Sequence, residues 1–334
     1  MAHATIRDVA RAANVSIATV SRALNGHGNV RANLRERVQS VAAALGYVPH
    51  TGARSLSLAQ TNAIGVMLPD LHGEFYSEAL RGMDGEASAR GLQLLLSNMH
   101  ADAELAAQAM RSMRGRVDGL IVMAPQLDAE GLREALPGGV PAVLVNSLDG
   151  AGCAGFRIAN AEGIATVVAH LAATGRRRLV HVGGPAGNID ARERCEGFLT
   201  AMARHAPDIE PVVIEGDFRE DSGAAAVAIL RARGVAFDGI VAANDMMALG
   251  VLAALREEGL SVPGDVAVTG FDDIPLARYL GLTTMRVPLA EMGARAVARL
   301  IDALEGGTLT PDTQVVATDL VIRTTTEALT SRSD

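Results

Sequence analysis

Residues 5–25 read TIRDVARAANVSIATVSRALN, and this stretch predicts two short helices separated by a tight turn. Thr5 followed by Asp8 has the spacing of a capping box, which starts a helix. Apolar residues then recur on one helical face, and Asn14 can adopt the left-handed conformation that ends a helix. Ser16 can cap a second helix only two residues later. The stretch therefore predicts a helix, a short turn and a second helix.

A third helix is predicted from an apolar stripe with helical spacing. The stripe consists of Leu34, Val38, Val41, Ala42 and Leu45. Gly46 ends it, and Pro49 prevents its continuation. Two short helices joined by a turn of about three residues, packed on a third helix, form the helix-turn-helix design, in which the second helix enters the major groove of DNA.

The exposed side chains of the second helix are therefore candidates for DNA contacts. Arg22 can bind guanine O6 and N7 together, whereas Ile17 and Ala18 can contact thymine methyl groups. The other candidates carry hydroxyl or amide groups suited to phosphates. The complete set of candidate contacts in the head is Thr5, Ser16, Ile17, Ala18, Thr19, Ser21, Arg22 and Asn25. Because three-helix bundles also bind proteins, the helical pattern alone leaves a protein partner open.

Charge favours DNA over a protein partner. The first 60 residues hold seven Arg and two acidic residues, a net charge of +5. The remaining 274 residues hold 23 Arg and 36 acidic residues, a net charge of −13. A basic head on an acidic body indicates that the head binds a polyanion, so we expect double-stranded DNA as its partner.

Composition excludes several other classes of protein. The chain is 49% hydrophobic and 20% charged, which is typical of a globular protein and not of a disordered or collagen-like chain. No apolar run approaches the roughly 20 residues of a membrane helix, and the N-terminal residues lack the apolar core of an export signal. Cys153 and Cys195 provide neither a disulfide framework nor metal-ligand spacing. We therefore expect a cytoplasmic protein with no membrane partner, metal or cofactor.

From Asn62 onward, predicted buried strands alternate with helical patterns. The first series of strands covers residues 64–68, 92–97, 120–123 and 142–145, and the second covers 179–182, 212–215, 239–242 and 266–269. The segment VDGLIV at 117–122 recurs as FDGIVA at 237–242. Two similar halves imply two doubly wound α/β lobes, with ligands bound beyond the carboxyl ends of the strands.

The head closely resembles the lactose-repressor (LacI/GalR) family of bacterial transcription regulators. The stretches that carry the resemblance are TIRDVARAANVSIATVSRALN at 5–25 and RERVQSVAAALGYVPHTGARSL at 35–56. Arg31, Leu34 and His50 depart from the family pattern, in which Ser, Thr and Asn are usual. The departures concern single phosphate contacts and the cap of the third helix, and the rest of the module matches the pattern.

The resemblance also implies the domain organisation. It predicts an α/β chain with an N-terminal helix-turn-helix head and a two-lobed, periplasmic-binding-protein-like (type I) core of doubly wound parallel sheets. The head covers residues 1–48 and a hinge helix or linker covers 49–60. The N-subdomain of the core comprises 61–160 and 289–318, and the C-subdomain comprises 161–288 and 319–334.

Within the hinge, two residues are implied DNA contacts. The hinge spans about two helical turns, too few for a stable isolated helix. By resemblance it orders only on DNA, pairs with its dimer mate, contacts DNA through Ala53 and inserts Leu56 into the minor groove. A plain flexible linker is the alternative.

Polar side chains and rare aromatic residues gather just after the predicted strands, where a ligand cleft should lie. The chain has only nine aromatic residues, and four of them fall at these positions. Matched to the family pattern, the implied effector contacts are Phe75, Tyr76, Asn146, Asp190, Arg194, Phe218, Asn244 and Asp272. An aromatic face, an Arg and several Asn and Asp groups suit a polyhydroxylated ligand. For Asp245 and Asp273 the simpler role of helix cap weighs equally, and Phe271 fits a core position.

We therefore expect a sequence-specific DNA-binding transcriptional regulator, a repressor of a carbohydrate-utilisation operon controlled by a small sugar-like effector. Two heads on one palindromic operator imply a homodimer, and the C-terminal residues lack the leucine heptads that would extend it to a tetramer. A non-sugar effector such as a nucleobase or sugar acid, or a DNA-bound architectural role without ligand, are alternatives. A sugar-processing enzyme is disfavoured, because Gly183–Gly187 lacks the dinucleotide-binding spacing and no nucleophile elbow is present.

Overall fold

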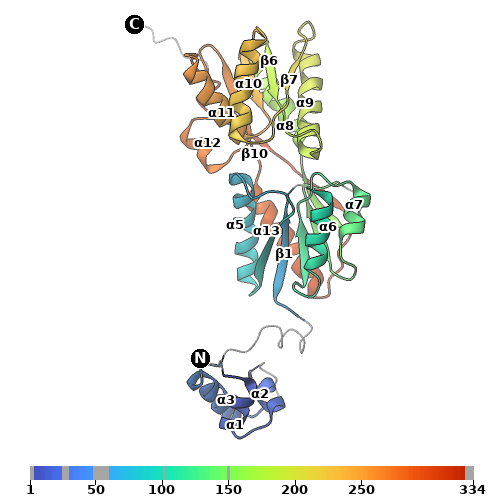
Figure 1. Cartoon of the computed structure of the whole chain (residues 1–334). Coiled ribbons are helices and arrows are strands. Elements are labelled where there is room, and N and C mark those ends of the chain that lie inside the picture. Colours follow the sequence, from blue (N-terminus) through green and yellow to red (C-terminus); the bar gives the residue numbers. More distant parts are fainter. Residues whose placement is uncertain (1–3, 25–29, 48–59, 101, 149–150, 328–334) are drawn as a thin grey trace. The chain divides into compact units, whose positions relative to one another are not determined.

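The protein, seen as a computed structural model, forms two compact units, Met1–Thr61 and Asn62–Asp334. The structure describes residues 4–24, 30–47, 60–100, 102–148 and 151–327 (Figure 1).

The first unit contains three helices, α1 (Ile6–Ala12), α2 (Ile17–Leu24) and α3 (Ala32–Ala44). At the start of α1, Asp8 Oδ2 accepts hydrogen bonds from the Thr5 N–H (3.0 Å) and the Thr5 hydroxyl (2.7 Å). Asn14 has a φ of 50°, and Ser16 Oγ accepts a hydrogen bond from the Thr19 N–H at 3.1 Å. The residues that the sequence assigned to ending α1 and starting α2 therefore do so, Asn14 through its backbone and Ser16 through its side chain.

The three helices bury one small core. Val9, Val20 and Val38, one from each helix, are fully buried in it. Because every helix contributes to this core, none could keep its place without the other two. The predicted helix-turn-helix head is confirmed.

The second unit contains two six-stranded sheets, which define two lobes. The sheet of the first lobe has the order β11-β5-β4-β3-β1-β2. It consists of β1 (Ala63–Leu68), β2 (Gln93–Asn98), β3 (Gly119–Val122), β4 (Ala142–Val145), β5 (Ala154–Ile158) and β11 (Thr313–Val316). The sheet of the second lobe has the order β12-β10-β9-β8-β6-β7. It consists of β6 (Leu179–Val182), β7 (Val212–Ile214), β8 (Gly239–Ala242), β9 (Ala267–Asp272), β10 (Thr283–Arg286) and β12 (Asp319–Val321). Every pairing is parallel except that of β10 with β12.

Helices pack on both sheets (Figure 1). Those of the first lobe are α5 (Glu74–Ala89), α6 (Ala103–Ser112), α7 (Ala129–Ala135) and α13 (Leu289–Leu304). Those of the second lobe are α8 (Asn160–Ala173), α9 (Ile189–His205), α10 (Glu220–Ala232), α11 (Asp245–Glu257) and α12 (Pro275–Tyr279). Helices α5 and α13 lie side by side in close backbone contact, since a Cβ on Gly82 would overlap the carbonyl of Ala290. Among the described residues no helix has the length and apolar character to cross a membrane.

The chain crosses between the two sheets three times. It passes from β5 to β6, returns from β10 through α13 to β11, and leaves again from β11 to β12. The predicted α/β architecture with two parallel-sheet lobes is confirmed. Four short strands, β5, β10, β11 and β12, were not predicted, and β9 continues to Asp272, so that Phe271 and Asp272 lie within the strand and not after it.

Candidate functional site

A cavity of about 60 Å³ lies between the lobes, at the carboxyl ends of their strands. Seven of the eight predicted effector residues line it: Phe75, Tyr76, Asp190, Arg194, Phe218, Asn244 and Asp272. Phe75 and Tyr76 come from the first turn of α5, after β1. The others follow or end strands of the second lobe, because parallel strands direct their carboxyl ends to one edge of the sheet.

Arg194 on α9 is the centre of this site, and it is only 2% exposed. Its Nε donates a hydrogen bond to Asn160 Oδ1 at 2.8 Å, and its Nη1 donates one to the Ala243 carbonyl at 2.6 Å. The guanidinium carbon lies 3.9 Å from the centre of the Phe271 ring, which is fully buried. Hydrogen bonds and ring stacking therefore fix the orientation of the guanidinium, and Phe271 serves as core beneath it.

Asp272 faces Arg194 with an oxygen that is not hydrogen bonded. Arg194 Nη2 lies 3.6 Å from Asp272 Oδ1, which makes an ion pair but not a hydrogen bond. Among the described residues this oxygen has no hydrogen-bond donor. Burial raises the pKa of Asp272 to about 7, although the charge of Arg194 lowers it. A ligand hydroxyl that donates to this carboxylate would supply the missing hydrogen bond.

Asn160, which the sequence analysis did not identify, holds the second carboxylate. Its Nδ2 donates to Asp190 Oδ1 at 2.8 Å, while its Oδ1 accepts from Arg194. Burial raises the pKa of Asp190. Asn160 was missed because it follows β5, a strand too short and mixed in character to stand out in the sequence.

Aromatic side chains form the apolar part of the wall. The rings of Phe75 and Tyr76 meet edge to face, with centroids 5.2 Å apart. Phe218 has a φ of 69°, and its carbonyl accepts a hydrogen bond from Asn244 Nδ2 at 2.9 Å. Asn244 also caps α11, where its Oδ1 accepts from the Met247 N–H at 2.9 Å. Both polar atoms of Asn244 therefore serve the fold as well as the cavity wall.

Asn146, the eighth predicted effector residue, is not among the residues that line this cavity. It is buried after β4 with a φ of 47°, and neither atom of its amide has a hydrogen-bond partner among the described residues. Asp245 and Asp273 have structural roles. Asp245 accepts hydrogen bonds from the Ile274 N–H and the Thr284 hydroxyl, and Asp273 pairs with two arginines.

Four further residues line the cavity without having been predicted: His72, Gly73, Asn188 and Met246. All four lie in or next to the loops that follow strands, so position after a strand was the available signal. No group of His, Cys, Asp or Glu side chains in the described part of the chain is arranged to hold a metal ion.

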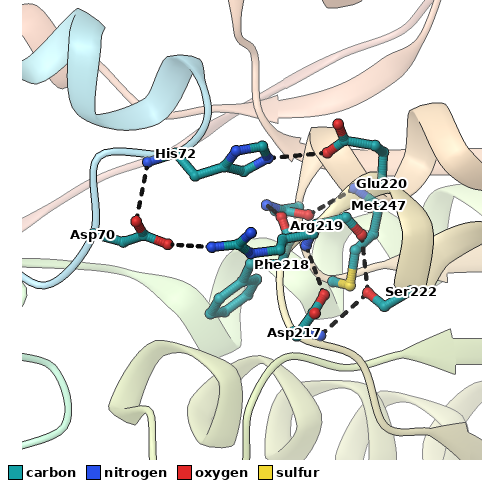
Figure 2. Close-up of polar contacts among 9 residues, drawn as sticks. Asp70, His72, Asp217, Phe218, Arg219, Glu220, Ser222 and Met247 are labelled. Carbon is teal, nitrogen blue, oxygen red and sulfur yellow. Dashed lines mark hydrogen bonds and ion pairs between the residues drawn. The ribbon is translucent and has the colours of Figure 1, made fainter. Parts of the chain in front are cut away.

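Polar contacts join the two lobes beside the cavity. Arg219 Nη2 donates to Asp70 Oδ2 at 2.9 Å, and His72 Nε2 lies 3.1 Å from Glu220 Oε2. Figure 2 shows both pairs, with the Arg219 guanidinium directed at Asp70 and the His72 ring directed at Glu220. These pairs link the loop after β1 to the start of α10, at Arg219 and Glu220.

On the head, the predicted contact residues of α2 are largely accessible. Ile17 is 45% exposed, and Ala18 and Arg22 are also exposed. Ser16 and Thr19 hydrogen bond to each other at 2.8 Å, and Ser21 is half-buried. Asn25, and the hinge residues Ala53 and Leu56, lie outside the described residues, so their predicted roles stay predictions.

Comparison with known proteins agrees with the geometry of both units. Residues 5–50 match the model of bacterial regulatory proteins of the lacI family, and residues 168–326 match the periplasmic binding protein-like domain. The chain is 31% identical over 326 residues to the ribose operon repressor of Halalkalibacterium halodurans, covering 97% of each chain.

Two solved structures extend the comparison. The chain is similar to the lac repressor dimer bound to operator and the anti-inducer ONPF, with a TM-score of 0.87, 30% identity and coverage of 98% and 100% of the two chains. It is also similar to the transcriptional regulator CelR in its cellobiose complex, with a TM-score of 0.71, 30% identity and coverage of 96% and 99%. The chain belongs to the LacI family: it is a DNA-binding transcription regulator with a periplasmic-binding-protein-like effector domain, and not an enzyme.

Proposed function

We propose that this regulator is a repressor of a carbohydrate-utilisation operon, and that a neutral sugar-like effector bound between the lobes controls its affinity for operator DNA. The observation that carries the proposal is the buried pair of Arg194 and Asp272 in the cavity wall, with an Asp272 oxygen that no described residue hydrogen bonds. A sugar hydroxyl can donate to that oxygen, and the apolar face of the ring can stack on Phe218.

Charge distinguishes a neutral effector from a sugar acid. The cavity wall holds two carboxylates, Asp190 and Asp272, against the single guanidinium of Arg194. That guanidinium already donates to Asn160 and to a backbone carbonyl. An anionic ligand would meet two buried carboxylates with little donor capacity left to receive it, so we favour an uncharged polyhydroxylated molecule over an acid.

The relatives point in the same direction. One is named for the ribose operon, and another has been solved with cellobiose. For this chain we infer the class of effector, a saccharide.

For the head, we propose that α2 reads the major groove and that Arg22 makes the base-specific contact. A palindromic operator would bind two heads of a homodimer, with the hinge residues Ala53 and Leu56 in the minor groove. The exposure of Ile17, Ala18 and Arg22 on one short helix supports this assignment.

The test begins with the full-length protein and selection of its operator from a random DNA library. Affinity for the selected DNA is then measured by fluorescence anisotropy while monosaccharides, disaccharides, sugar acids and nucleobases are added. We expect at least one neutral saccharide to change operator affinity by about 5- to 150-fold, the usual range of allosteric coupling. A response only to sugar acids or nucleobases would contradict the proposed effector class.

A pair of matched variants locates the site. Phe218→Leu removes a ring from the cavity wall and should weaken effector binding about 3- to 10-fold, since aromatic stacking contributes about 0.5–1.5 kcal/mol. Phe237→Leu alters another half-buried Phe of the second lobe that does not line the cavity. It should leave effector binding unchanged. Equal effects of the two variants on effector binding would show that the cavity is not the effector site.

A further inference from the structure

We propose that the effector site has a second compartment, which binds a second uncharged, hydroxyl-bearing unit. The effector is then a disaccharide or a similar glycoside, and Gln126 is the residue that recognises its second unit. This inference rests on the proposed function, because the first unit must occupy the Arg194 cavity.

The second compartment is a cavity of about 150 Å³ next to the first, which measures about 60 Å³. The two share four lining residues, His72, Tyr76, Asn188 and Phe218, so a ligand can extend from one to the other past the same aromatic rings. A single ring in the first cavity would therefore leave the second cavity unfilled.

Gln126 gives the second cavity its chemistry. It lies on the loop after β3 and lines this cavity. Its amide nitrogen and oxygen are both buried, and neither has a hydrogen-bond partner among the described residues. The loop is fixed in place, since the Pro125 carbonyl accepts a hydrogen bond from the Ile189 N–H at 3.0 Å. Buried amide groups without partners destabilise a protein, and a bound molecule in this cavity would supply the partners that the described residues do not.

The chemistry of an amide indicates what it binds. Its nitrogen only donates and its oxygen only accepts, whereas a hydroxyl does both. Two adjacent sugar hydroxyls can therefore accept from the nitrogen and donate to the oxygen of one Gln side chain. Pro69, Pro125 and Pro185 also line the cavity. Their fixed φ angles and missing N–H groups provide a rigid, apolar surface for the face of a ring.

The charged residues of the cavity argue against an anionic second unit. The Arg219 guanidinium already pairs with Asp70, and the backbone N–H of Arg219 donates to Asp217 Oδ1 at 2.9 Å. His72 pairs with Glu220 (Figure 2). The described lining thus contains two carboxylates, and each of its cationic side chains already faces a carboxylate, so the charge of the lining disfavours a phosphate or carboxylate.

The test is titration calorimetry of the full-length protein with defined sugars. Glucose is compared with cellobiose, maltose and trehalose, and galactose with lactose and melibiose. We expect one disaccharide to bind at least tenfold more tightly than its constituent monosaccharide. In Gln126→Met, which keeps the length of the side chain but removes both polar atoms, disaccharide affinity should fall about 5- to 100-fold, corresponding to two lost hydrogen bonds. Affinity for the monosaccharide should not change.

A stability measurement checks that the variant remains folded. Without ligand, the melting temperature of Gln126→Met should equal or exceed that of the wild type, because two unsatisfied buried groups have been replaced by apolar ones. Gln108→Met, at an exposed position on α6, is the matched control and should alter neither stability nor binding.

Two outcomes would overturn the inference, and they are distinguishable. If a monosaccharide binds as tightly as its disaccharides and Gln126→Met binds both normally, the second cavity holds only water and the proposed function survives. If no saccharide of either size binds, the proposed function fails and this inference fails with it. The comparison of sugars on the wild-type protein decides between these outcomes even if the variant does not fold.

Discussion

Replacing Arg194 with Met should destabilise the second lobe as well as impair ligand binding. Arg194 and Asp272 form a buried pair with side chains 3% and 4% exposed. Removal of one partner from a buried ion pair leaves the other charge without compensation, and this costs about 3–5 kcal/mol. Met fills much of the space that Arg194 occupies. The measured loss of stability therefore reports the missing interactions of the guanidinium more than the creation of a cavity.

The loss should depend on pH, and its sign follows from Asp272. With Arg194 present, the pKa of Asp272 is about 7, already raised by burial and held down by the guanidinium. Without Arg194 the pKa of Asp272 rises further, because the nearby positive charge that favours the ionised carboxylate is gone. At pH 8 the wild-type carboxyl is mostly ionised, so the variant loses the full attraction of the pair. At pH 6 the wild-type carboxyl is mostly protonated, so less is lost. Because the variant's Asp272 is already protonated at pH 8 once its pKa exceeds 8, the part of the loss that depends on pH is limited to about 1.4 kcal/mol, the equivalent of one pKa unit.

Urea unfolding of wild type and Arg194→Met at pH 6 and pH 8 measures the loss of stability and its dependence on pH. A second variant, Arg194→Met with Asp272→Asn, removes the uncompensated charge and should recover part of the stability at pH 8. Arg192→Met on the same helix is the control. Arg192 lies 3.9 Å from Glu196 with side chains 54% and 66% exposed, so its loss should change the free energy of unfolding by less than about 1 kcal/mol. An Arg194→Met cost under about 1 kcal/mol, or one that is the same at both pH values, would refute the reasoning.

Three further predictions concern packing, DNA binding and acid stability. Gly82→Ala should destabilise the protein by about 1–3 kcal/mol because its methyl group would overlap the backbone of α13. Gly85→Ala, one turn along α5 in open space, should stabilise it by about 0.5–1 kcal/mol, and similar melting temperatures for the two would contradict the packing argument. In anisotropy assays, Arg22→Ala should weaken operator binding by about 1–3 kcal/mol while sparing random DNA, and Arg111→Ala in the second unit should affect neither. Equal losses on both DNAs would mean that Arg22 contacts only phosphate. Burial lowers the pKa of His181 to about 4, so below pH 6.5 the unfolded chain takes up a proton that the folded chain does not. Stability should therefore fall between pH 6.5 and pH 4 in urea unfolding, and His181→Phe should show a smaller fall. An equal fall in that variant would assign the effect to other groups.

Much of the fold could be predicted from sequence because its signals are local. A helix cap such as Ser16 acts within one turn, and Asn14 ends α1 through its own backbone conformation. Eight of the strands could be predicted from apolar runs, which are also local signals. The short strands β5 and β10 carry no such run and exist because neighbouring strands supply their hydrogen bonds.

Seven residues of the cavity could also be predicted, because parallel strands bring the residues that follow them to one edge of the sheet. The hydrogen-bond partners of these residues could not be predicted. Asn160 reaches Arg194 from a helix 34 positions away in sequence. Asn146 follows a strand as the others do, yet it does not line their cavity. Side-chain direction and distance between loops, which decide these cases, depend on how whole elements pack.

By itself, then, the sequence determined the head, the two lobes and the edge at which a ligand site should lie. Each of these follows from periodicity, capping or charge along a short stretch of chain. Only the tertiary structure decided that Arg194 both supports the lobe and lines the cavity, that burial raises the pKa of Asp272 to about 7, and that Gln126 borders a second cavity. The physical reason is that desolvation and hydrogen-bond partnership depend on every group surrounding a side chain, and those groups come from distant parts of the chain.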